Sequence, residues 1–172
     1  MRKLLDVTFA GAGLLACLLL VVMVVVMFAA IVMRQFGVLL PGHEEIATFA
    51  MVGMAFLGLP YAYRTGAHVR IETLVARLPD PARIRMNIWC VAVAMAICVV
   101  FCYFALNLVR DSFAFGDISE GLLAIPRWIP QLPIPLGLAL FAAALLDDLI
   151  VLVRGGKASF ELPQQDGAMP AE

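Results

Sequence analysis

The chain alternates long uncharged stretches with short polar ones. Four stretches contain no Asp, Glu, Lys or Arg, namely 7–33, 46–63, 86–109 and 128–146. A helix that crosses about 30 Å of hydrocarbon needs about 20 residues, and a window of about 17–25 is the usual range. The pattern therefore predicts an all-α membrane protein with four transmembrane helices. We expect one domain over residues 1–155 and a flexible cytoplasmic tail over residues 156–172.

A basic segment at 61–79 separates the second uncharged stretch from the third. Its apolar residues recur at the spacing i, i+3, i+4 and i+7, which is one face of a helix: Ile71, Leu74, Val75 and Leu78. The run is too short to cross the membrane. It predicts a short amphipathic helix lying in the cytoplasmic membrane surface. A plain cytoplasmic turn that contacts anionic lipids is the alternative.

Composition supports the membrane class. Hydrophobic residues make up 63% of the chain, charged residues 15%, and the mean hydropathy is +0.98. Soluble domains are about 45–50% apolar and about 25% charged, so one small soluble core is excluded. A basic start followed by an apolar run also resembles a signal peptide, with Cys17 in a lipoprotein-like context. Because the apolar run continues well beyond Cys17, we expect an uncleaved helix instead.

The basic residues predict the orientation. If the N-terminus is cytoplasmic, three basic residues face outward: Arg34, Arg110 and Arg127. Nine then face the cytoplasm: Arg2, Lys3, Arg64, Arg70, Arg77, Arg83, Arg85, Arg154 and Lys157. Nine against three obeys the positive-inside rule, so both termini are expected in the cytoplasm.

Residues that carry redox or metal chemistry are sparse. His43 and His68 fall on opposite sides of the membrane, which argues against a haem held between two helices. Four cysteines lie within uncharged stretches and are expected to be reduced, small packing residues, with Cys98 and Cys102 on one face of the core: Cys17, Cys90, Cys98 and Cys102. No charged residue lies in the middle of a span, where ion and substrate pathways place them. We therefore expect no catalytic, cofactor or metal site, and a chain that supports another membrane protein.

Two acidic pairs leave alternatives open. Glu44 and Glu45 open the second span, where carboxylates stabilise a helix N-terminus; alternatively, one of them binds a partner or a cation at the membrane edge. Asp147 and Asp148 interrupt the fourth span. Either they pair with arginines of the 64–85 segment, or the span ends at Leu146 and they are hydrated.

A family resemblance rests on the basic segment and its surroundings. Its run R-x-x-x-H-V-R-I-E-x-L follows a span that bears glycine, and an acidic pair opens that span. The matching residues are Glu45, Gly58, Arg64, His68, Val69, Arg70, Ile71, Glu72 and Leu74. Further matches are Leu123-x-Ile125-Pro126-x-Trp128 and Pro135-x-Gly137. Over about residues 2–155, the chain resembles the small membrane subunit of TRAP (tripartite ATP-independent periplasmic) transporters.

The resemblance implies a scaffold in a bacterial inner membrane. A large permease subunit would carry sodium and an organic acid that a periplasmic binding protein delivers; no nucleic acid is involved. Candidate contacts with that subunit or with lipid are Arg64, His68, Arg70, Glu72, Arg77, Asp147 and Asp148. Candidate residues for docking the binding protein are Glu44, Glu45, Asp117, Glu120, Arg127 and Trp128. The alternatives are a membrane anchor of a redox enzyme complex and a small subunit of another binding-protein-dependent carrier.

Overall fold

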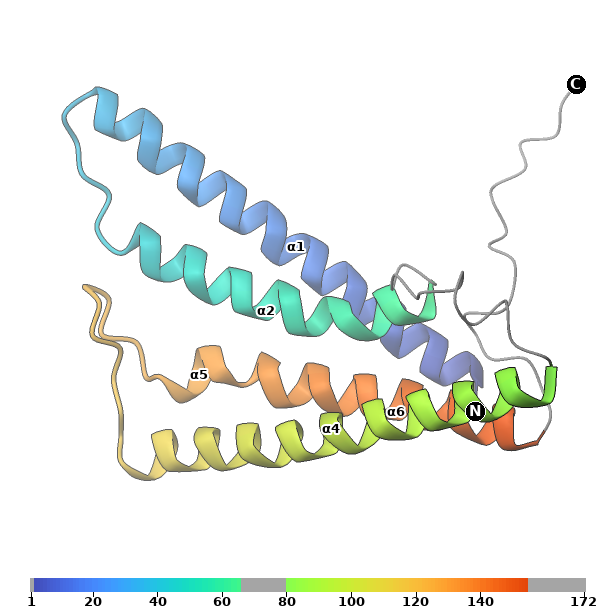
Figure 1. Cartoon of the computed structure of the whole chain (residues 1–172). Helices are drawn as coiled ribbons and strands as arrows, with labels where there is room; N and C mark the ends of the chain where they lie inside the picture. The colour runs from blue at the N-terminus through green and yellow to red at the C-terminus, as the bar shows by residue number, and fades with distance from the viewer. Residues whose placement is uncertain (1, 66–79, 155–172) are drawn as a thin grey trace, which may run out of the picture.

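The structure consists of helices joined by short connections. The computed structural model describes residues 2–65 and 80–154, with side chains from Leu5 and from Ala82 onward. Its helices are α1 (Arg2–Gln35), α2 (His43–Arg64), α4 (Asp80–Ala114), α5 (Trp128–Gln131) and α6 (Pro133–Val153) (Figure 1). Four segments are long and apolar enough to cross a membrane: Leu5–Gln35, His43–Arg64, Ala82–Ala114 and Trp128–Val153. The all-α prediction with four spans is confirmed. The interfacial helix expected at 71–78 and the tail at 156–172 lie outside the described residues.

The helices pack in the order α1, α2, α6, α4. The extensive contacts join α1 to α2, α2 to α6 and α6 to α4. Figure 1 shows α1 diverging from α4 toward the end of the molecule where the helices are joined by loops. We call this the loop end, and the opposite end the Arg64 end. In an apolar 18-residue stretch of each span, 33% of the residues are buried in the second and fourth spans. The corresponding shares are 11% in the first span, which is α1, and 17% in the third, which is α4.

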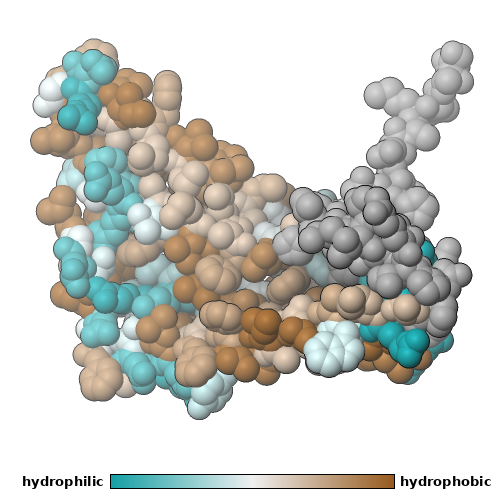
Figure 2. Space-filling model, viewed as in Figure 1, coloured by the Kyte–Doolittle hydropathy of each residue, from teal (hydrophilic) through white to brown (hydrophobic). Residues whose placement is uncertain are grey.

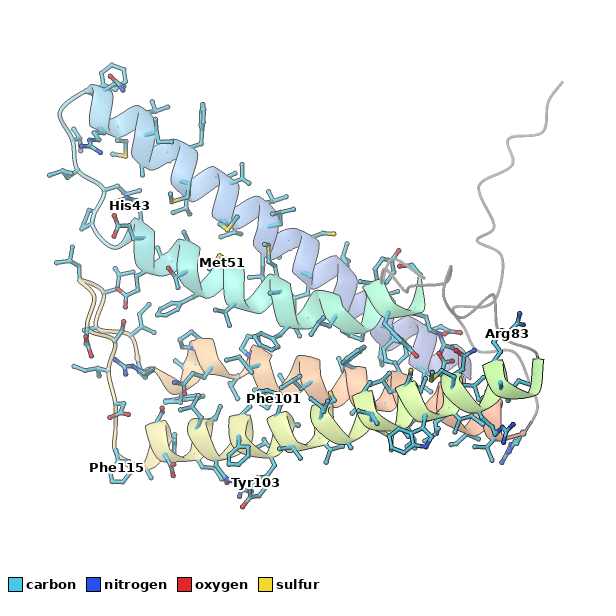
Figure 3. All side chains as sticks on the ribbon, viewed as in Figure 1. His43, Met51, Arg83, Phe101, Tyr103 and Phe115 are labelled. Atoms are coloured by element: carbon cyan, nitrogen blue, oxygen red, sulfur yellow. The ribbon has the colours of Figure 1, made fainter. Side chains whose placement is uncertain are left out.

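The outer helices consequently expose large apolar side chains. Leu14 and Phe28 on α1 are 73% and 67% exposed, and Trp89 on α4 is 71% exposed. Figure 2 shows apolar residues covering the lengths of the helices, with polar residues concentrated toward the loop end. In Figure 3, Tyr103 points away from α6. Such surfaces are stable only against lipid or another protein.

Glycines allow the closest helix contacts. A Cβ on Gly137 of α6 would collide with the backbone carbonyl of Phe56 in α2. On the other side of α2, a Cβ on Gly53 would lie 2.7 Å from the Leu19 side chain of α1. In a bilayer, where burial from water adds little, such close approach supplies the packing that holds helices together.

Two helix boundaries differ from the sequence prediction. The predicted third span ends at Val109, but α4 continues through Asp111 to Ala114. The predicted fourth span is divided at Leu132 into α5 and α6, with Pro133 in the first turn of α6, where its missing N–H has no helical partner to lose. α6 then continues past Leu146 to Val153.

The cysteines are free, but only two of them pack in the core. Cys98 on α4 is buried, and its Sγ lies 3.2 Å from the Leu138 carbonyl oxygen on α6. One turn later, Cys102 Sγ lies 3.6 Å from the Pro135 carbonyl oxygen. The pair therefore joins α4 to α6 through weak hydrogen bonds. Cys17 and Cys90 are exposed on the outer surface, so within the described chain they are not packed.

Candidate functional site

At the Arg64 end, one guanidinium joins three helices. Arg64, the last residue of α2, donates from Nη2 to Asp6 Oδ1 of α1 at 2.7 Å and from Nη1 to Asp147 Oδ2 of α6 at 3.0 Å. Its Cζ also lies 5.6 Å from the ring centroid of Phe9. The Arg64 and Asp147 side chains are 17% and 19% exposed, while Asp6 is 52% exposed. Of the two interpretations of Asp147, the structure therefore shows the paired one.

The adjacent carboxylate lies deeper in the protein. Asp148 is 0% exposed, and the core beside it includes Leu145 and Leu152. Tyr63, one residue before Arg64, is 4% exposed, and its ring packs edge-to-face on Phe141 of α6 at 5.4 Å. Because Asp148 is fully buried and Asp147 is paired with Arg64, the structure does not support the alternative in which the fourth span ends at Leu146 and both aspartates are hydrated. The end of α2 is instead tied to α6 by both polar and aromatic contacts.

At the loop end, Glu45 joins the start of α2 to the loop over residues 115–127, which we call the second loop; the first loop is 36–42. Its Oε2 accepts a hydrogen bond from the Leu123 backbone N–H at 3.2 Å. Gly121 lies directly over the same carboxylate, leaving no room for a Cβ. Gly42 packs against the Leu123 side chain and has φ of 76°, which favours glycine. Glu45 thus serves as an acid in the first turn of α2 and as the acceptor that holds the second loop.

The second loop has its own internal structure. Ile118 and Pro126 form an isolated antiparallel bridge, flanked by hydrogen bonds from Ser119 N to the Ile125 carbonyl (2.8 Å) and from Arg127 N to the Asp117 carbonyl (2.9 Å). These bonds give the loop a defined surface. Exposed apolar side chains stand on this end of the molecule: Phe36 at 79%, Leu39 at 80%, Phe115 at 80% and Leu122 at 80%.

The predicted docking residues do gather at this end. The Glu44 and Glu120 side chains are 88% and 93% exposed, and Asp117 is also exposed. Arg127 pairs with Glu120 at 3.4 Å. Trp128 is half-buried, with its ring packed edge-to-face on Phe113 at 5.6 Å. In Figure 3, His43 and Phe115 mark this end, and Arg83 lies at the opposite one.

An open cavity lies between α2 and the second loop. Its volume is about 510 Å³, and its lining includes Glu45, Phe49, Arg127, Gln131 and Ile134. Sequence patterns single out Glu45 and Arg127 but not Gln131, nor Asp6 at the Arg64 end. Nothing in the periodicity marks Gln131, which lies in the four-residue helix α5. Asp6 could have been noticed as the last charge before the first apolar run.

Four of the predicted contact residues cannot be placed. His68, Arg70, Glu72 and Arg77 lie outside the described residues. Across residues 5–65 and 82–154, no group of three or more His, Cys, Asp or Glu side chains is arranged to hold a metal ion.

Replacing Gly121 with alanine should loosen the second loop. The new Cβ would overlap the Glu45 carboxylate, so either the loop or the flexible Glu45 side chain must move, and either movement weakens the bond from Leu123 N–H. Loss of a hydrogen bond to a charged group costs about 1 kcal/mol or more, enough to raise local opening roughly fivefold. The rate of trypsin cleavage after Arg127 measures this opening. Leu122→Ala, an exposed change in the same loop, is the control, and equal cleavage of both variants would contradict the prediction.

Comparison with known proteins agrees with this architecture. Residues 23–155 match the family described as Tripartite ATP-independent periplasmic transporters, DctQ component. The chain belongs to this family. The DctQ match covers the C-terminal part of α1 and all the later helices, and makes the chain a multi-pass membrane subunit of a TRAP transporter. Asp6 lies before the matched segment.

Two relatives of the DctQ chain carry informative names. It is 28% identical over 130 residues to the C4-dicarboxylate TRAP transporter small permease protein DctQ of Rhodobacter capsulatus, covering 76% of this chain and 55% of that protein. It is 26% identical over 113 residues to the isethionate TRAP transporter permease protein DctMQ of Oleidesulfovibrio alaskensis, covering 64% of this chain and 17% of that protein. The chain therefore spans about half of the first relative and about a sixth of the second.

Proposed function

We propose that this DctQ-family chain is the scaffold subunit of a sodium-driven, binding-protein-dependent transporter for organic acids. It would pair with a large permease subunit that carries sodium and substrate, while a periplasmic binding protein docks at the loop end. The chain itself would be no enzyme and would need no cofactor. Membership of the DctQ family favours this over a redox-complex anchor.

One observation carries the proposal: charge is confined to the two ends of the described helices. The stretches between those ends, 7–33, 46–63, 86–109 and 128–146, hold no charged residue, whereas a solute pathway usually has polar groups near the midplane. The exposed apolar faces of α1 and α4 supply surface for a large membrane partner. The names of the two relatives mention C4-dicarboxylate and isethionate, which are organic anions and support that substrate class.

Reconstitution tests this function. We expect proteoliposomes holding this chain and its large partner to take up a radiolabelled C4-dicarboxylate when a sodium gradient and the binding protein are supplied. Omitting this chain should abolish uptake. Uptake by this chain alone, or full uptake without it, would refute the scaffold role.

The orientation has its own test. With both termini in the cytoplasm, alkaline phosphatase fused after Gly116 should be active and phosphatase fused after Arg154 should be inactive.

Replacing Arg70 and Arg77 with glutamate removes two charges from the cytoplasmic excess and adds two of the opposite sign. We expect this double variant to lower the yield of complex with the large subunit. Unchanged topology and unchanged yield would count against the predicted role of the basic segment.

A further inference from the structure

We propose that the outer stripe of α4, the side of the helix opposite α6, packs against a transmembrane helix of the large permease subunit, and that the Tyr103 hydroxyl hydrogen-bonds to that helix. This inference rests on the proposed scaffold function and adds which face of the chain meets the large subunit. α1 and α4 are the two outer helices, and the residues that they turn away from the rest of the chain differ in kind.

The outer stripe of α4 contains small and polar residues. Val91 and Cys98 are buried on the side of α4 that faces α6, and successive residues of an α-helix are about 100° apart, which defines the opposite side. Five exposed residues and the half-buried Asn107 lie there: Trp89, Val93, Ala96, Val100, Tyr103 and Asn107. Interfaces between membrane helices are enriched in small residues and in side chains that hydrogen-bond across helices.

The outer stripe of α1 has no polar group. Ala16 is buried on the side that faces α2, where it lies close to Gly58. The opposite side holds large apolar residues that are 38% to 73% exposed: Leu14, Leu18, Val21, Val25, Phe28 and Val32. Lipid chains can cover this stripe, because none of its side chains needs a hydrogen bond. The contrast favours α4 over α1 as the helix that meets another protein.

Tyr103 places a hydroxyl group within the span. The side chain is 61% exposed and points away from α6 (Figure 3). Its ring packs edge-to-face on Phe104 at 5.6 Å, and its hydroxyl makes no hydrogen bond with any described residue. Tyr103 belongs to the uncharged stretch 86–109 and lies about 9 Å along the helix from the loop-end limit of that stretch. The isolated chain would therefore expose this hydroxyl to hydrocarbon.

The direction of α4 keeps the Tyr103 hydroxyl away from the nearer membrane surface. Side chains on an α-helix are inclined toward its N-terminus, and α4 begins at the Arg64 end (Figure 1). Tyr103 is therefore inclined toward the middle of the membrane, whereas a tyrosine of the interfacial belt has its hydroxyl among the headgroups. A hydroxyl in an apolar environment without a hydrogen bond is destabilising. An acceptor on a partner helix removes that cost, and Ala96 leaves room for such a helix to approach.

Photo-crosslinking in the membrane tests which face meets the large subunit. The photoreactive amino acid benzoylphenylalanine replaces either Val100 of α4 or Val21 of α1 in the full chain, co-expressed with a tagged large subunit. The two valines are matched, because each lies near the middle of its span and they are 53% and 58% exposed. We expect at least fivefold more cross-linked large subunit from position 100 than from position 21.

Substitutions at the same positions test the packing and the hydrogen bond. Val100→Trp should lower the amount of this chain that co-purifies with the tagged large subunit at least fivefold, whereas Val21→Trp should leave it unchanged. Tyr103→Phe keeps the ring and removes the hydroxyl, so it should weaken the affinity between the subunits roughly threefold. The thermal midpoint of the isolated Tyr103→Phe chain should not change, which distinguishes loss of an intersubunit bond from loss of stability.

The outcomes separate this inference from the scaffold function. Cross-linking of the large subunit from position 21 but not from position 100 would overturn the assignment to α4 and leave the scaffold function standing. Cross-linking from position 100 to a second copy of this chain, or unchanged co-purification of both Val100→Trp and Tyr103→Phe, would overturn it as well. If the unaltered chain formed no complex with the large subunit, the scaffold function would fail and this inference with it.

Discussion

Replacing Arg64 with glutamine should lower the free energy of unfolding by about 2–4 kcal/mol. The side chain joins α1, α2 and α6, and its loss leaves Asp147, only 19% exposed, without its guanidinium partner. Removing one partner of a buried pair is costly because the remaining charge stays desolvated. Unfolding of the purified chain in mixed detergent micelles measures the effect.

A double-mutant cycle distinguishes loss of the pair from loss of the side chain. Asp147→Asn added to Arg64→Gln removes the stranded charge, so the double variant should be more stable than the sum of the two single effects predicts, by about 1–3 kcal/mol. Arg83→Gln is the matched control, because Arg83 is an exposed arginine at the same end. If Arg64→Gln were no more destabilising than Arg83→Gln, the cluster would not hold the three helices.

Replacing Gly137 with valine should push α6 away from α2. The first side-chain atom would already collide with the Phe56 carbonyl, and a backbone group cannot rotate aside as a side chain can. Overpacking costs about 1–3 kcal/mol, and valine adds two methyl groups to a contact that has no room for one. We expect a loss at the upper end of that range and a lower thermal midpoint.

Alanine substitutions at Gly137 and at two other glycines provide the comparison for this test. Alanine raises helix propensity by about 1 kcal/mol over glycine, so Gly137→Ala should be milder than Gly137→Val but still destabilising. Gly11→Ala, with nothing within 4 Å of its new Cβ, and Gly58→Ala, 3.7 Å from the Ala16 Cβ, should be neutral or stabilising. Equal effects of alanine at positions 137, 11 and 58 would contradict the close contact between α2 and α6.

The sequence was sufficient to predict the spans because a charge-free stretch of sufficient length has few other stable environments. The sequence prediction ended α4 and α6 too early, because a hydropathy pattern shows where a charged residue lies but not which residue pairs with it. Asp147 remains within α6 because Arg64, 83 residues away along the chain, reaches it. That pairing depends on how two helices approach at Gly137, which no local pattern encodes.

The loop end was less predictable for a related reason. The acidic start of α2 was readable from Glu44 and Glu45, and α2 does begin with both residues in its first turn. The bond from Leu123 N–H to Glu45 requires the fold of the second loop, including the left-handed backbone at Ala124 (φ 46°). Gln131 lines the cavity from the four-residue helix α5, which no amphipathic pattern in the sequence marks out.

The unequal burial of the four helices affects how a cell would regulate this subunit. Only 11% of the residues in the apolar 18-residue stretch of α1 are buried by the rest of the chain, so much of the helix's stabilisation must come from neighbours. A partner that binds only the folded chain adds stability in proportion to the logarithm of its concentration. Copies made in excess of the proposed large permease partner would then unfold more often and be degraded by membrane proteases. Turnover of these orphan copies would keep the two subunits in matched numbers without control of their synthesis.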